Sequence, residues 1–136
     1  MTGDDLRWVS ALELGGLIRS KQVSPVEVTE AVLAGIKGVD PTLNAFCTLT
    51  PEIARRDARE AEIAVMKSEP LGLLHGIPVS IKDLVFTRGV RTTGGSRIYA
   101  DFSPDQDAVA VERLKAAGAV LLGKTNTPEF GHKGVT

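Results

Sequence analysis

The residues with the clearest chemical potential are a serine and a lysine at the end of a short apolar run. From Gly76 to Asp83, apolar and polar residues alternate with the period-two pattern of a β-strand. Ser80 and Lys82 then share one strand face, at the carboxyl end of the strand. A lysine in such a run is costly to bury unless it is paired or functional, and burial lowers the pKa of an ammonium group. Lys82 is therefore a candidate general base.

Simpler interpretations of the same pair remain open. Lys82 could pair with Asp83 or extend into solvent at the strand end. Ser80 could act as a nucleophile with Lys82 as its base, because side chains two strand steps apart point the same way. Ser80 could equally fill a small space beneath the lysine.

Helical patterns dominate residues 1–70, before this strand. A capping box from Ser10 to Glu13 predicts a short helix. Ser24-Pro25 begins a second helix, which we expect to stop at Asp40-Pro41. Thr50-Pro51 opens a third helix, with small apolar residues on one face and charged residues elsewhere. This alternation predicts an outer helix that packs closely through its alanines.

Residues 71–136 predict a strand, a helix and a second strand. The first strand spans 77–81, and a further short strand is expected at 84–87. Ser103 is expected to cap a helix that ends at Gly118, before a buried strand at 119–122. This order favours parallel strands, which would place Lys82 and the turn 123–126 at the ligand-binding carboxyl edge of a sheet. The expected fold class is α/β, as a single unit over residues 1–136.

A competing motif overlaps the second strand. The stretch from Gly118 to Thr125, with Gly123-Lys124 before the threonine, fits the phosphate-loop pattern of an NTPase. A true phosphate loop follows a strand and opens a helix, whereas here the residues between the two glycines have the composition of the strand itself. The approaching Pro128 also disfavours an immediate helix. We expect Lys124 to be structural or to lie near the substrate edge.

Composition limits the remaining classes of protein. Of 136 residues, 43% are hydrophobic and 24% are charged, as in ordinary globular domains. The net charge of -1 and an aromatic content of 4% give no basis for nucleic-acid binding. Cys47 is the single cysteine, and no apolar run is long enough for a membrane span. A cytoplasmic location without membrane contact is the expectation, and no spacing of histidine and cysteine suggests a metal site.

Several segments together resemble the amidase signature family. In order along the chain they are residues 74–83, Thr92-Thr93-Gly94-Gly95-Ser96, residues 107–109, residues 114–119 and residues 122–130. The whole chain is similar to the amino-terminal part of such an enzyme. The resemblance implies a helical section leading into the first strands and crossover helix of a larger mixed sheet.

The resemblance also implies a function. Family members hydrolyse amides with a Ser, cis-Ser and Lys triad, and Lys82 matches the lysine. Both family serines follow in a later glycine- and serine-rich segment, and no Gly-Ser-Ser-Gly-type run occurs in this sequence. The implied activity is hydrolysis of a carboxamide through an acyl-serine, with this chain supplying only the lysine and inactive alone. No metal or organic cofactor is implied.

The family motifs suggest further site residues and partners. The residues expected to bind substrate or lie near the site are Thr93, Gly94, Gly95, Ser96, Thr125 and Asn126. The resemblance implies a small-molecule amide as substrate, and it leaves open the role of a broad amidase or of one component of an amidotransferase for misacylated tRNA. Alternatively, the chain is a non-catalytic fragment or interaction module that pairs through an open strand edge with a second copy or a complementary C-terminal chain.

Overall fold

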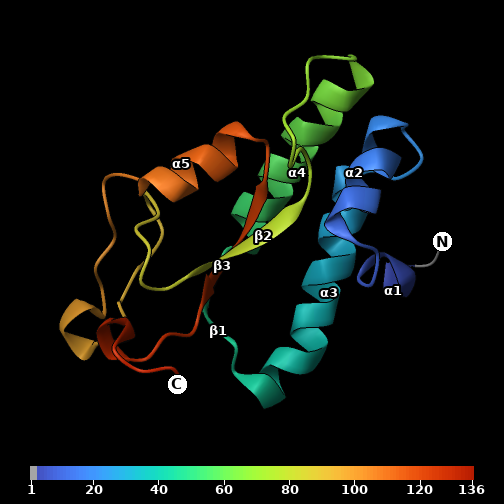
Figure 1. Cartoon of the computed structure of the whole chain (residues 1–136). Helices are drawn as coiled ribbons and strands as arrows, with labels where there is room; N and C mark the ends of the chain where they lie inside the picture. Colours follow the sequence, from blue (N-terminus) through green and yellow to red (C-terminus); the bar gives the residue numbers. More distant parts are fainter. Residues whose placement is uncertain (1–2) are drawn as a thin grey trace.

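The computed structural model describes residues 3–136 and contains a three-stranded mixed sheet (Figure 1). Its strands are β1 (Phe46–Leu49), β2 (Pro78–Lys82) and β3 (Val120–Thr125), in the spatial order β1-β3-β2. The central strand β3 pairs in parallel with β2 and antiparallel with β1. The predicted α/β class and the parallel pairing of the two predicted strands are both confirmed.

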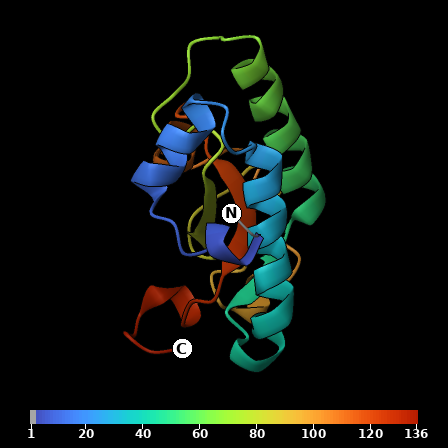
Figure 2. The same ribbon diagram turned by 90° about the vertical axis from the view of Figure 1, so that its right-hand side faces the viewer.

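Helices cover both faces of this sheet. The helical elements are α1 (Gly3–Leu6), α2 (Ala11–Arg19), α3 (Pro25–Leu43), α4 (Pro51–Met66), α5 (Val109–Ala116) and the 3-10 turns η1 (Arg97–Tyr99) and η2 (Glu129–Gly131). Figures 1 and 2 show α5 on one side of the strands and α3 with α4 on the other. The short η1 and η2 turns lie together near the C-terminal end of the chain, below the sheet in Figure 1.

Each helical layer contributes its own apolar core. On the α5 side, Val111 packs against Ile81 and Leu121 of the parallel strands. On the other side, the buried Ala54 and Ala58 of α4 lie against β3, together with Leu33 of α3. The small side chains let α4 approach the strands closely, as the alanine stripe predicted. A third core joins α1 and α2 to α3, α4 and β2 through Leu6, Leu14, Ile18, Val28, Val65 and Ile77.

The helix α3 begins as predicted but ends later. Ser24 and its partner glutamate form the expected capping box. The prediction of a stop at Pro41 was wrong, because the helix continues to Leu43 with the proline in its last turn. There the missing N–H costs a single hydrogen bond, and the helix ends where Asn44 adopts a left-handed conformation with φ 50°. The Asn44 N–H donates to the Asp40 carbonyl at 2.7 Å.

Two predictions about the segment between β2 and β3 were also wrong. The helix α5 begins at Val109 rather than just after Ser103, because residues 103–108 bind loop groups instead. Asp107 accepts a hydrogen bond from the Arg88 N–H at 2.7 Å, and the N–H of Ala108 donates to Phe86 at 2.9 Å. Residues 84–87 form no strand, because the chain turns immediately after β2.

Strand β1 was not predicted, and β3 extends beyond the apolar run that predicted it. The extension passes through a bulge, in which Val79 pairs with Leu121 but Ser80 pairs with Gly123. Gly123 has φ 145°, and a Cβ there would lie 2.3 Å from the Thr48 carbonyl oxygen of β1. Because Gly123 has no side chain, the backbones of β1 and β3 can approach this closely. Gly123 thereby allows the antiparallel strand β1 to pair with the sheet.

We predict opposite effects for two glycine substitutions. Gly123→Ala should lower the free energy of unfolding by about 2–4 kcal/mol, because the methyl group collides with backbone that cannot move freely. The matched control Gly38→Ala, in α3, should raise it by about 0.5–1 kcal/mol. A Cβ at Gly38 meets no heavy atom within 4 Å. Urea unfolding of both variants tests this, and equal stabilities for the two would contradict the bulge geometry.

Candidate active site

The sheet places Lys82 at the carboxyl end of β2, opposite Thr125 of β3. The N–H of Asp83, the next residue, donates to the Thr125 carbonyl at 2.9 Å. Parallel strands meet at this edge, so Lys82 and Thr125 lie together as the sequence suggested. After β2 the chain turns at once, because the Val85 N–H donates back to the Lys82 carbonyl at 2.9 Å.

The side chain of Lys82 is exposed, and so is that of Ser80. Val79 and Ile81 pack toward α5, so the strand period turns Ser80 and Lys82 to the opposite face. On that face α3 and α4 pack over β3 but leave the end of β2 open. Within residues 3–136, no hydrogen bond or ion pair involves the Lys82 ammonium group. The expected shielding of this amine is therefore not provided by the described chain, and no hydrogen bond joins Lys82 to Ser80.

The loop that follows is held against Asp83, which is buried. Both the N–H and the hydroxyl of Thr93 donate to Asp83 Oδ2, the former at 3.1 Å. The Gly94 N–H donates to the Asp83 carbonyl at 2.8 Å, and the Gly95 N–H donates to Thr93 Oγ1 at 3.1 Å. The predicted near-site residues Thr93 and Gly94 thus contact Asp83, and Gly95 is bonded to Thr93.

The remaining part of this loop binds the chain after β3. Ser96 is buried, and its hydroxyl donates to Glu129 Oε1 at 2.7 Å. The Phe130 N–H donates to the Gly94 carbonyl at 2.7 Å. Residues 93–96 and 129–130, which are far apart in the sequence, are therefore one layer at the carboxyl edge of the sheet.

Asn126 lies at the same edge but is engaged elsewhere. Its side-chain amide donates to the Asn44 carbonyl, and its N–H donates to Ala45 at 2.8 Å. Both partners belong to the connection between α3 and β1. The amide of Asn126 ties this connection to the sheet, and Thr125 is the residue of the pair that faces Lys82 across the strands.

The buried lysine of this edge is Lys124, whose side chain has 0% exposure. Its ammonium group donates to three oxygens of the loop that follows β2: the carbonyl of Val85, Thr92 Oγ1 at 2.9 Å and Thr87 Oγ1 at 3.2 Å. Burial lowers the pKa of Lys124, and the Asp83 charge opposes this shift. The sequence pattern suggested that Lys82 would be the buried lysine, whereas the buried lysine in the structure is Lys124.

This placement rules out a phosphate loop within the described chain. The segment Val120–Thr125 is the strand β3 itself, so its backbone N–H groups cannot curl around a phosphate. The ammonium group that would contact the phosphates is enclosed by Val85, Thr87 and Thr92. The motif is matched by residue type alone.

Two residues to which the sequence assigned no site role complete the edge. Arg91 donates from Nε to the Ala100 carbonyl at 2.6 Å and from Nη1 to Thr48 Oγ1 at 2.9 Å, which fixes the loop to β1. Burial raises the pKa of the Cys47 thiol to about 11, and the nearby Asp83 carboxylate adds to the shift. An arginine in a loop and a lone cysteine carry no pattern from which these contacts could be deduced.

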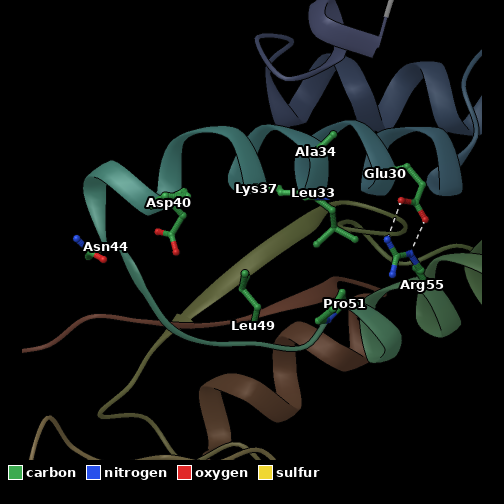
Figure 3. A pocket seen from close by; sticks show the side chains of 10 residues that line it. Glu30, Leu33, Ala34, Lys37, Asp40, Asn44, Leu49, Pro51 and Arg55 are labelled. Atoms are coloured by element: carbon green, nitrogen blue, oxygen red, sulfur yellow. Dashed lines mark hydrogen bonds and ion pairs between the residues drawn. The ribbon is translucent and has the colours of Figure 1, made fainter.

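A further hollow lies elsewhere and contains none of the predicted site residues (Figure 3). It has a volume of about 570 Å³ and lies between α3, β1 and the start of α4. Leu33 and Leu49 provide apolar surface, while Glu30 and Arg55 form an ion pair at 2.7 Å at one end. The charges of Glu30 and Arg55 thus satisfy one another.

Among residues 3–136, no group of three or more His, Cys, Asp or Glu side chains could hold a metal ion. In the same part of the chain, no helix is both long enough and apolar enough to cross a membrane.

Comparison with known proteins gives consistent matches over this geometry. A family model described as Amidase matches residues 27–136. A glutamyl-tRNA(Gln) amidotransferase component from Salinispora tropica is 48% identical over 126 residues, which are 93% of this chain and 26% of the relative. An acylamidase of Rhodococcus erythropolis is 42% identical over 136 residues, which are 100% of this chain and 28% of the relative.

Solved structures match in the same way. A bacterial aryl acylamidase of the amidase signature family superimposes with a TM-score of 0.89 and 36% identity, over 95% of this chain and 27% of the other. The peptide amidase of Stenotrophomonas maltophilia gives 0.84 and 34%, over 90% and 25% of the two chains. The chain thus spans about a quarter of the length of the curated relatives it matches.

We predict that Lys124→Met lowers the free energy of unfolding by about 1–3 kcal/mol, because buried loop oxygens lose their donor. Lys133→Met is the control, since Lys133 is exposed, and its change should stay within about 0.5 kcal/mol. Chemical denaturation gives both values. An unchanged stability for Lys124→Met would show that the ammonium group does not hold the loop.

The same lysine should make stability depend on pH in a defined direction. The pKa of Lys124 in the folded chain lies below the ordinary 10.5. Between these two pKa values, the unfolded chain therefore binds more protons than the folded chain. Stability from this group then rises with pH. The unfolding free energy of the wild type relative to Lys124→Met should increase as the pH approaches 10.5 from below. A difference that falls over this range would contradict a desolvated ammonium group.

Proposed function

The chain belongs to the amidase signature family, and on this premise we propose that it contributes the catalytic lysine, Lys82, to hydrolysis of a carboxamide. The observation that carries the proposal is the position of Lys82. It ends β2 at the carboxyl edge, opposite Thr125 and next to the loop of residues 93–96. Residues 1–136 then act as one unit, the amino-terminal part of an amidase domain.

The chemistry follows from the resemblance of the Lys82 motif to that of the family. A neutral amine accepts a proton through one serine and thereby activates a second serine, which attacks the amide carbonyl. The leaving amine takes a proton, and water then hydrolyses the acyl-serine. A lysine acts as a base only when it is neutral, and burial favours that form. Because Lys82 is exposed in the described chain, its cover and its serine partners must come from other residues.

Two kinds of physiological role fit this proposal. Relatives include an acylamidase and components of amidotransferases, which would correspond to a free amide substrate and to an amide-transferring complex. A non-catalytic interaction module is the alternative from another class. This alternative is supported equally, because β2 is an outer strand of the sheet and Ser80 and Lys82 are exposed on it. The unpaired edge of such a strand can bind a second chain.

A chimera separates these functions. Residues 1–136 should replace the matching segment of the Rhodococcus erythropolis acylamidase, to which they align along their whole length. We predict amide hydrolysis by this chimera on a substrate of the parent enzyme, and no ammonia release by the 136-residue chain alone. Lys82→Met should lower kcat/KM of the chimera by at least about 10²-fold, the usual effect of removing a general base.

The matched control is Lys67→Met, which removes an exposed lysine at the end of α4 and should leave kcat/KM unchanged. A folded chimera whose activity survives Lys82→Met would refute the catalytic assignment. A folded chimera without activity would favour the interaction module. Hydrolysis by the chain alone that requires both Ser80 and Lys82 would instead support a two-residue site on β2.

A further inference from the structure

Asp83, the residue directly after Lys82, carries a buried carboxylate with 1% exposure. The burial comes from the described chain itself, so it does not depend on a further partner that covers the edge of the sheet. Removing a carboxylate from water is costly unless hydrogen bonds compensate for the lost hydration. Compensating contacts are therefore expected around this side chain.

Four hydrogen bonds hold residue 83 in place. Its N–H donates to the Thr125 carbonyl at 2.9 Å, and its carbonyl accepts from the Gly94 N–H at 2.8 Å. One oxygen of its carboxylate, Oδ2, accepts from both the N–H and the hydroxyl of Thr93. The backbone on the C-terminal side of Lys82 is thus attached to β3 and to the loop of residues 93–95.

The other carboxylate oxygen, Oδ1, is buried and has no hydrogen-bond partner in the described chain. A buried acceptor without a donor is costly. The Cys47 thiol of β1 lies beside this carboxylate, and its Sγ is 3.4 Å from the Lys124 carbonyl oxygen. Burial raises the pKa of the thiol to about 11, and the Asp83 carboxylate adds to this shift. A thiol with such a pKa keeps its proton at neutral pH and can donate it to a carboxylate.

From these contacts we propose that Asp83 is a positioning residue for Lys82. Its Oδ2 holds the loop of residues 93–95, its Oδ1 accepts a hydrogen bond from the Cys47 thiol, and this bridge fixes the backbone from which Lys82 projects. Within residues 3–136, no hydrogen bond or ion pair joins the carboxylate to the Lys82 ammonium group, so Asp83 acts through the backbone. The catalytic meaning rests on the proposed hydrolysis, whereas the bridge itself requires no catalysis.

Cys47 is the single cysteine of the chain, so its reactivity tests the bridge directly. The charged groups that face the thiol are Asp83 and Arg91 of the loop after β2 and Lys124 of β3. Asp83→Asn removes the negative charge and keeps the shape, so the pKa of the thiol should fall. Alkylation of the 136-residue chain by iodoacetamide near about pH 8.5 should then become at least about threefold faster. An unchanged rate would overturn the bridge.

The matched control is Asp107→Asn. Asp107 also anchors the loop after β2, because it accepts from the Arg88 N–H at 2.7 Å and pairs with Lys115 at 2.7 Å. The control should therefore loosen the loop without changing the alkylation rate of Cys47. Equal acceleration in the two variants would show that the thiol responds to loosening of the loop and would refute a direct contact with Asp83.

Amide exchange tests whether the bridge fixes the backbone at Lys82. The Val85 N–H donates to the Lys82 carbonyl at 2.9 Å, and the Gly94 N–H donates to residue 83. In Asp83→Ala both amides should exchange at least about tenfold faster than in the wild-type chain, as followed by NMR. Asp83→Asn should show a smaller increase, since its amide oxygen can still accept from Thr93. Unchanged exchange in Asp83→Ala would show that the carboxylate does not position Lys82.

The chimera with the Rhodococcus acylamidase connects the bridge to catalysis. Asp83→Ala should lower kcat about 10²-fold and raise KM by less than about tenfold, because a misplaced base slows the chemical step more than it weakens binding. Asp83→Asn should retain more of kcat, and Asp107→Asn should leave kcat unchanged. If Asp83→Ala does not fold, Asp83→Asn decides, with a fall in kcat of at least about threefold.

A folded Asp83→Ala chimera with the kcat of the unsubstituted chimera would overturn the positioning role. A chimera that is inactive before any substitution at residue 83 would instead refute the proposed hydrolysis. In that case the alkylation and exchange rates of the 136-residue chain still decide whether Asp83 holds Lys82 in place.

Discussion

The buried ammonium group of Lys124 is the interaction on which the carboxyl edge of this sheet depends. A charge enclosed by protein is tolerated only when its donors are satisfied, and Lys124 meets that condition through three oxygens of one loop. The bulge at Gly123 sets the register in which Lys124 lies opposite Ile81. The loop is therefore held close to the strand end, and with it the turn after Lys82 and the hydrogen bonds from Thr93 and Gly94 to Asp83.

Local patterns accounted for the elements with strong local causes. The capping box at Ser24, the alanine stripe of α4 and the alternating run of β2 each follow from short-range chemistry, and each is observed. Strand β1 was not predicted because it is short and is stabilised by pairing with β3, which is distant in the sequence. The late start of α5 has a similar cause, since Asp107 is engaged by Arg88, which lies far from it in the sequence.

The candidate site shows the same division. The sequence brought Lys82, Thr125 and the loop of residues 93–96 to one edge, and the structure places them there. Which lysine is buried could not be deduced, because the two strands carry similar apolar runs before their lysines. A bulge, which is a tertiary feature, decides that Lys124 lies opposite the buried Ile81 and turns inward.

Because Lys82 is exposed in the described chain, the proposed function requires that further residues of an amidase cover this amine and bring serine hydroxyls to it. The most direct measurement is a crystal structure of residues 1–136 joined to the remaining segment of the Rhodococcus erythropolis acylamidase. In that structure we expect Lys82 Nζ to lie out of solvent, within about 2.6–3.2 Å of a serine hydroxyl from that segment. A Lys82 side chain that remains in open solvent, with no hydroxyl near it, would contradict the account.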